Sequence, residues 1–224
     1  TGVRNVRRAN GAVDGYQTQC LAIGDGIDYE KYELNPILSA DDLPGGSSVF
    51  EFRDPKIWYD AGKYYAVVGN RSADNSGAIL LYESEDIFHW RFVSVVANCH
   101  NQFGKMWECP DLFFLDGKAV LLTSPQEMTS MGLEFHPGNS TLCIIGDFDP
   151  KEKHLTRDNT QAIDYGTDFY ATQTLETPDG RRIMIAWMQS WESSGCKVGE
   201  LPFFGQMTLP RELSIRDGDR KSVV

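Results

Sequence analysis

Two short segments of the chain carry acidic residues in the same sequence frame. Arg53-Asp54-Pro55 opens the segment 53–63, and Glu108-Cys109-Pro110 opens the segment 108–118. The segments align without gaps, so that the prolines, the apolar and aromatic positions and the final Gly-Lys coincide. Each segment predicts a strand that runs into a glycine-containing hairpin turn. Internal repetition would bring Asp54 and Glu108 to one rim of the fold, and a pair of carboxylates is what glycoside hydrolysis requires.

The rest of the chain reads as short apolar or alternating runs broken by Gly, Asp, Asn and Pro, which is typical of all-β proteins. The expected strands are 52–59, 63–69, 78–83 and 90–96 in a first unit, 107–115, 118–123, 140–147 and 154–164 in a second, and 182–188 and 206–215 in a third that starts at Asp168. Four antiparallel strands in each repeat of ~50–60 residues indicate blades of a β-propeller. A β-sandwich would not explain the gapless repeat.

The number of units predicts an incomplete propeller. We expect roughly three blades and an N-terminal partial blade, in which residues 16–38 form the outer part of an earlier blade. A propeller closes with at least four blades. Open blade edges favour pairing with another chain, so self-association is expected. Asp168 lies near the start of the third unit, and we expect Asp54, Glu108 and Asp168 to face one end of the central channel.

Composition excludes several classes of function. The 21 basic and 32 acidic residues give a net charge of −11, which argues against binding to nucleic acid. No apolar run approaches the ~20 residues of a membrane span, and no signal peptide pattern opens the chain. The five cysteines and four histidines show no metal-site spacing. We therefore expect a cytoplasmic protein with reduced thiols, a small substrate, and no metal, cofactor, membrane or nucleic-acid partner.

Several motifs together resemble glycoside hydrolase family 32, which includes invertases, sucrose-6-phosphate hydrolases, inulinases and levanases. The matching segments are 52–55, 106–111, 164–171, 186–188 and 206–213. The last segment is most similar to the bacterial sucrose-6-phosphate hydrolase branch. The resemblance implies a five-bladed β-propeller followed by a β-sandwich, with an axial pocket for one fructosyl unit. It also implies hydrolysis of β-fructofuranosides such as sucrose, sucrose 6-phosphate or fructans with retention of configuration.

The resemblance assigns roles to three residues of the repeated frames. Glu108 matches the acid/base, Asp54 matches the transition-state stabiliser, and Arg53 lies beside them as a sugar-pocket residue. An apolar neighbour such as Trp107 suits a carboxyl group that must carry a proton near neutral pH. Asp54, beside Arg53, is expected to stay ionised and to accept hydrogen bonds from sugar hydroxyls.

Further substrate-binding candidates lie outside these frames. At least one of Asp164 and Asp168 is expected to contact a fructosyl hydroxyl. Trp187 is a candidate wall of the pocket or a core residue, and Cys109 is a pocket-lining or a structural residue. Three other tryptophans are assigned to blade packing or the rim: Trp58, Trp90 and Trp191.

The chain departs from the family pattern at the nucleophile. In the family this carboxylate belongs to an N-terminal Asn-Asp-Pro-Asn-Gly-type motif, and no such motif occurs in residues 1–224. We therefore expect residues 1–224 to be the central part of a catalytic propeller, without the first blade and the β-sandwich. One alternative is a catalytically inactive carbohydrate-binding chain. Another, a five-bladed glycosidase acting on arabinose or xylose polymers, is disfavoured by the joint presence of Arg-Asp-Pro and Glu-Cys-Pro-Asp.

Overall fold

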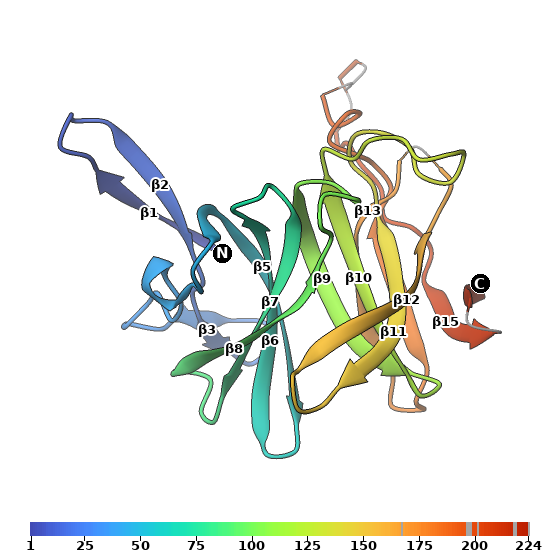
Figure 1. The fold of residues 1–224 in the computed structure, drawn as a ribbon, viewed down its shortest axis with the longest axis horizontal. Coiled ribbons are helices and arrows are strands. Elements are labelled where there is room, and N and C mark those ends of the chain that lie inside the picture. Colours follow the sequence, from blue (N-terminus) through green and yellow to red (C-terminus); the bar gives the residue numbers. More distant parts are fainter. Residues whose placement is uncertain (167, 196–198, 201, 217–218, 224) are drawn as a thin grey trace.

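The computed structural model describes residues 1–166, 168–195, 199–200, 202–216 and 219–223. These residues form β-strands and one short 3-10 helix, η1 (Ala40–Asp42). Three four-stranded antiparallel sheets follow one another along the chain, and two strand pairs precede them (Figure 1). Each four-stranded sheet is a meander in which sequential strands are neighbours, as in a propeller blade. The predicted all-β propeller architecture with three blades is confirmed.

The strands of the blades lie close to their predicted positions. The first blade contains β5 (Ser47–Asp60), β6 (Lys63–Ser72), β7 (Gly77–Ser84) and β8 (Trp90–Asn98); the second contains β9 (Met106–Leu115), β10 (Lys118–Gln126), β11 (Leu142–Asp149) and β12 (His154–Ala162); the third contains β13 (Tyr170–Glu176), β14 (Arg182–Trp187), β15 (Arg211–Arg216) and β16 (Asp219–Val223). The turns between the first two strands of the blades use Gly62, Gly117 and Gly180 at φ of 85°, 79° and 82°. Glycine adopts this left-handed backbone without steric cost.

Two predicted strand boundaries differ in the third blade. Its first strand begins at Tyr170 rather than at Asp168, and its third begins at Arg211 rather than at Gln206. In the segment before Arg211, Met207 forms only an isolated bridge with Trp187.

The N-terminal strands form two separate hairpins. They are β1 (Gly2–Arg7) with β2 (Val13–Thr18), and β3 (Ala22–Gly24) with β4 (Tyr29–Lys31). The β1–β2 hairpin projects away from the blades (Figure 1). An isolated bridge between Gln19 and Leu38 ties the second hairpin at its base. The described residues before β5 thus form two strand pairs and no four-stranded sheet.

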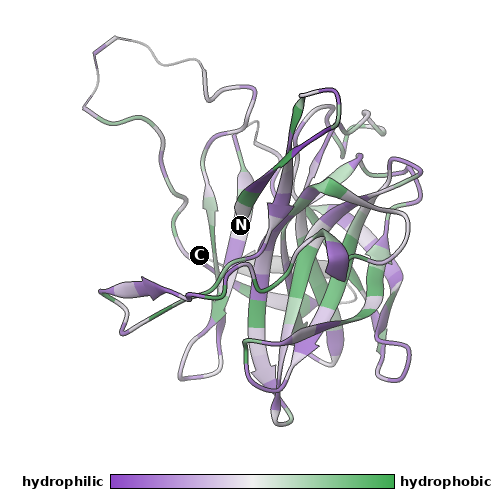
Figure 2. Ribbon diagram, turned by 90° about the vertical axis from the view of Figure 1, so that its left-hand side faces the viewer, coloured by the Kyte–Doolittle hydropathy of each residue, from purple (hydrophilic) through white to green (hydrophobic). Residues whose placement is uncertain are grey.

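The second blade is covered by apolar side chains on both of its faces. Leu112, Leu121 and Ile144 pack toward the first blade, whereas Val120 and Ile145 pack toward the third. Residues next to each other on a strand point to opposite faces of the sheet, so the apolar runs of β10 and β11 suit a blade buried on both sides. Figure 2 shows hydrophobic stretches in green within the strands of the sheets and hydrophilic residues in purple at many of the turns.

Cys20, Cys99 and Cys109 are free thiols, and Cys196 lies outside the described residues. No helix within the described ranges is long and apolar enough to cross a bilayer.

Candidate active site

The same β-bulge interrupts the first strand of all three blades. The bulges span residues 53–56, 108–111 and 170–173, and in each the first strand uses one residue more than its partner strand. The second residue of each bulge, Asp54, Cys109 or Ala171, has a left-handed φ of 61°, 49° or 55°. Bulges of this kind redirect side chains and are common beside active sites. They confirm the gapless alignment of the first two blades and extend it to the third.

The third blade carries a tyrosine at the bulge position where the second carries an acid. Tyr170 is the structural counterpart of Glu108, and Asp168 lies two residues before β13. Asp168 is exposed and accepts hydrogen bonds from Ser193 Oγ at 2.6 Å and Ser190 Oγ at 3.4 Å. Asp168 therefore lies outside the bulge that carries Arg53-Asp54 and Glu108-Cys109 in the first two blades.

Glu108 is a buried carboxylate surrounded by hydrogen-bond donors. Its Oε1 accepts from Arg53 Nε at 2.7 Å. Its Oε2 accepts from Tyr170 Oη at 2.6 Å, from Gln126 Nε2 at 2.9 Å and from Trp191 Nε1 at 3.4 Å. The four donors come from all three blades and from the loop after β14. They fix both carboxyl oxygens in one orientation, as a group that transfers a proton at a defined atom requires.

Arg53 lies between two carboxylates. Its guanidinium pairs with Glu108 and with Glu51, and it also contacts the amide oxygens of Gln17 and Gln126, each at 3.2 Å. Burial alone lowers the pKa of Arg53, but the hydrogen bond to Glu51 and the charge of Glu108 outweigh burial and raise it. Arg53 therefore stays charged at any working pH and anchors Glu108 from the neighbouring blade.

Asp54 is linked to Glu108 through Cys109, the residue that follows Glu108 in the chain. Asp54 Oδ2 accepts from the backbone N–H of Cys109 at 3.1 Å and faces Cys109 Sγ at 3.5 Å. Burial raises the pKa of the Cys109 thiol, and the charges of Asp54 and Glu108 raise it further. The thiol therefore stays protonated near neutral pH and supplies no thiolate nucleophile. In this structure Cys109 orients Asp54.

Two tryptophans form an aromatic edge beside Glu108. Trp187 and Trp191 meet edge to face with ring centroids 5.7 Å apart, and Trp191 reaches Glu108 with its indole nitrogen. Trp187 itself donates to Gln189 Oε1 at 3.0 Å. Trp191 is 53% exposed, so one face is open to a ligand. The sequence predicts a packing or rim position for Trp191, whereas the structure brings its indole nitrogen to Glu108.

Asp164 belongs to a separate ion pair. Its Oδ2 lies 2.8 Å from Arg211 Nη1, and its Oδ1 accepts from the Gly166 N–H at 2.7 Å. The Arg211 guanidinium also lies over the ring of Phe169, 5.1 Å from its centroid. These contacts tie the loop before β13 to β15, and the predicted sugar contact of Asp164 stays a prediction.

Trp107 positions the strand that carries Glu108, with its own side chain in the core. The indole of Trp107 is 1% exposed and donates to the carbonyl of Phe103 at 2.7 Å. A Cβ at Gly77 would lie 2.3 Å from this ring, and one at Gly69 would lie 2.2 Å from the Trp107 carbonyl oxygen. The two glycines thus allow β9 to approach the first blade closely. Trp107 is not among the hydrogen-bond partners of Glu108. The carboxyl group of Glu108 contacts the polar groups of Arg53, Gln126 and Tyr170 and the indole nitrogen of Trp191.

A second polar layer lies further along the same three strands. Lys56 Nζ reaches Asp111 Oδ2 at 3.4 Å, Gln173 Oε1 at 3.0 Å and the carbonyl of Thr174 at 2.8 Å. Asp111 is 2% exposed and also accepts from the backbone N–H of Thr174 at 2.7 Å. A cavity of about 550 Å³ lies beside this layer and does not include Glu108. Lys56 and Asp111 form the ion pair of this second layer, as Arg53 and Glu108 do in the first.

Replacing Tyr170 with Phe is expected to lower the free energy of unfolding by about 1.5–3 kcal/mol, the usual value of a hydrogen bond to a charged group. Burial raises the pKa of Tyr170 and the charge of Glu108 raises it further, so the hydroxyl stays protonated and donates. Tyr59→Phe is the control, because Tyr59 is 62% exposed. This substitution should change the free energy of unfolding by less than about 0.5 kcal/mol. Equal effects of the two variants in urea unfolding would contradict the assigned hydrogen bond.

The sequence alone did not reveal four residues of the hydrogen-bond network of Arg53 and Glu108. They are Gln17, Gln126, Tyr170 and Trp191. Gln17, Gln126 and Trp191 lie outside the repeated frames. Tyr170 could have been found by aligning the third blade on its bulge. No group of His, Cys, Asp or Glu side chains in the described ranges is arranged to hold a metal ion.

Comparison with known proteins gives one consistent result. The family model described as glycosyl hydrolases family 32 N-terminal domain matches residues 3–224. Sucrose-6-phosphate hydrolase of Bacillus subtilis is 35% identical over 218 residues, which cover 94% of this chain and 44% of that protein. Raffinose invertase of Escherichia coli is 37% identical over 205 residues, covering 90% of this chain and 41% of that protein.

Among solved structures, the GH32 beta-fructofuranosidase of Bombyx mori superposes with a TM-score of 0.83 at 37% identity. It covers 99% of this chain, which in turn covers 46% of that chain. Residues 1–224 thus span less than half the length of these relatives. The family model matches almost the entire chain. The blades, the bulges and the buried Glu108 of this structure agree with the sequence motifs that suggested the family. The chain belongs to glycosyl hydrolase family 32, and its residues 3–224 match the N-terminal domain of that family.

Proposed function

We propose that Glu108, Asp54 and Arg53 form part of an active site that releases fructose from a β-fructofuranoside. The observation that carries the proposal is the buried Glu108 carboxyl group, oriented by donors from three blades and linked to Asp54 through Cys109. The relatives support the substrate class, because they are named sucrose-6-phosphate hydrolase and raffinose invertase, and a variant of the Bombyx mori enzyme was solved in complex with sucrose. Sucrose and sucrose 6-phosphate are the substrates we propose.

The proposed reaction retains configuration and uses Glu108 twice. In the first step Glu108 donates its proton to the glycosidic oxygen while the bond from this oxygen to the anomeric carbon breaks and a carboxylate nucleophile bonds to that carbon. In the second step Glu108 takes a proton from the water that displaces the nucleophile. Asp54 accepts hydrogen bonds from fructosyl hydroxyls as positive charge develops on the ring. Trp191 provides an aromatic face next to the proton donor.

The 224-residue chain by itself is expected to release no fructose from sucrose above background. The two carboxylates nearest in the hydrogen-bond network are already engaged, Glu51 by Arg53 and Asp54 by Cys109, and the nucleophile motif of the family does not occur in the sequence. A reducing-sugar assay tests this. Fructose release that disappears in Glu108→Gln would show that another carboxylate of this chain acts as nucleophile, while leaving the role of Glu108 intact.

The second candidate function is binding of a carbohydrate without turnover. It is favoured by the same engagement of Glu51 and Asp54. The two functions separate in the protein that carries this chain: turnover of sucrose supports hydrolysis, and saturable sucrose binding with no turnover supports the binding function. A cytoplasmic location and self-association through open blade edges stay predictions.

A further inference from the structure

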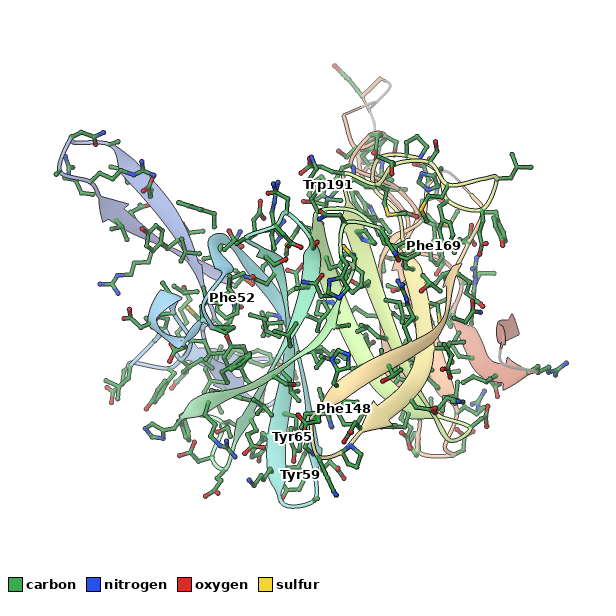
Figure 3. All side chains as sticks on the ribbon, viewed as in Figure 1. Phe52, Tyr59, Tyr65, Phe148, Phe169 and Trp191 are labelled. Atoms are coloured by element: carbon green, nitrogen blue, oxygen red, sulfur yellow. The ribbon has the colours of Figure 1, made fainter. Side chains whose placement is uncertain are left out.

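A second ligand-sized groove lies between the first and second blades, at the other end of the molecule from Trp191. It encloses about 260 Å³ and is lined by Trp58, Asp60, Tyr65, Phe114, Phe148 and Lys153, among others. Figure 3 shows Tyr65 and Phe148 at the lower end of the blades and Trp191 at the upper end. Drug-sized ligands occupy pockets of about 300–1,000 Å³, so this groove suits a smaller group such as one sugar ring.

The walls of the groove are two aromatic pairs. Trp58 and Tyr65, from β5 and β6, stack with centroids 5.5 Å apart and planes 22° apart. Phe114 and Phe148, from β9 and β11, meet edge to face with centroids 5.6 Å apart. Trp58, Tyr65 and Phe148 also pack against the core between the two blades. The walls are therefore held in place before any ligand arrives, which lowers the entropic cost of binding.

Polar groups around these walls have no partner within the described part of the chain. Within these residues no hydrogen bond or ion pair engages Trp58 Nε1, Tyr65 Oη or the Asp60 carboxylate. Lys153 Nζ only approaches the Tyr65 ring, at 5.6 Å from the ring centroid. The neighbouring cavity differs, because Lys56 and Asp111 neutralise each other in it. The groove thus offers three donors and one acceptor beside apolar faces.

We propose that this groove binds one ring of a neutral saccharide, at a site separate from Glu108. The apolar C–H faces of a sugar ring pack on aromatic rings, while its hydroxyls both donate and accept. Trp58, Tyr65 and Lys153 would donate to these hydroxyls and Asp60 would accept from them. The opposite charges of Asp60 and Lys153 favour a ligand with no net charge. This site does not depend on the reaction proposed for Glu108.

The test is titration of the isotope-labelled full chain with sucrose, fructose and maltotriose, followed by NMR of the tryptophan indole N–H signals. The Trp58 signal, assigned with Trp58→Phe, is expected to shift in a saturable way with at least one sugar. The saturation of this shift gives the dissociation constant of the sugar. Because hydrogen bonds from two side chains are lost, the double variant Asp60→Asn/Lys153→Met should raise this dissociation constant about tenfold or more. Tyr59→Ala is the matched control, since Tyr59 lies on the same strand but does not line the groove; it lines the adjoining cavity, which Trp58 and Asp60 also border. This variant should leave the dissociation constant within about twofold.

Two results would overturn the proposal. One is the absence of a saturable Trp58 shift with all three sugars. The other is a shift whose dissociation constant is the same in the double variant and in the unsubstituted chain. The Trp191 signal reports binding beside Glu108 in the same titration, so loss of binding at one site is distinguished from loss at the other.

Discussion

Glu108→Gln in the protein that carries this chain is expected to slow fructose release from sucrose by about 10²–10⁴-fold, the usual contribution of a general acid/base. The amide keeps the shape of the carboxyl group but has no acidic proton to give to the glycosidic oxygen. The fold should persist in this variant, since Arg53 keeps its partner Glu51. The measurement is kcat for sucrose, with circular dichroism to show that the variant is folded.

The control for this prediction is Glu127→Gln. Glu127 follows Gln126 in the sequence, but its carboxylate pairs with Lys105 and Arg71 and its side chain is 50% exposed. This substitution is expected to leave kcat within about twofold, since exposed ion pairs contribute little. A Glu108→Gln variant that keeps more than about a tenth of the original rate would contradict proton transfer by Glu108.

Arg53→Met is expected to have the largest effect on stability, lowering the free energy of unfolding by about 3 kcal/mol, at the lower end of the cost of breaking a buried ion pair. The side chains of Arg53 and Glu108 are only 15% and 9% exposed, and Glu51 loses its partner as well. Methionine fills much of the same volume, so the effect reports charge rather than a cavity. Urea unfolding at neutral pH measures the change in midpoint and slope.

Arg71→Met is the matched control for the arginine substitution. Arg71 pairs with Glu127 at 3.3 Å, and these side chains are 25% and 50% exposed. Its removal should cost less than about 1 kcal/mol, because exposed pairs are solvated and screened. Equal losses in the two variants would show that the Arg53–Glu108 pair contributes no more than a surface pair.

The repeat explains why so much of the fold could be predicted. Strands with alternating or apolar patterns lie where the sequence predicted them, and the identical frames at Arg53 and Glu108 correspond to identical bulges. The first strand of the third blade begins two residues later than the sequence predicts, at Tyr170. The turn between β13 and β14 covers residues 177–181, whereas the turns of the other blades cover only 61–62 and 116–117. Tyr170 lies 10 residues before Gly180, whereas Arg53 and Glu108 each lie 9 residues before Gly62 and Gly117, and Asp168 lies 12 residues before Gly180.

The surroundings of Glu108 were harder to predict than Glu108 itself. Arg53, Asp54 and Cys109 are in the repeated frames, and the structure brings all three to Glu108. Gln126 reaches Glu108 from the second strand of the same blade, and Trp191 reaches it from the loop after β14. The first contact depends on strand pairing within the blade and the second on how a loop of the third blade packs against the second blade. No local sequence pattern encodes either contact.

The leaving-group dependence of Glu108→Gln tests the central claim most directly. In the protein that carries this chain, pre-steady-state rates should be compared for sucrose and for 4-nitrophenyl β-fructofuranoside, whose leaving group departs without protonation. If Glu108 is the acid/base, the variant releases fructose from sucrose about 10²–10⁴-fold more slowly than the unsubstituted protein. With the nitrophenyl substrate it still releases a burst of nitrophenol, followed by slow turnover. Equal losses on the two substrates, with no burst, would contradict the assignment of Glu108 as the proton donor.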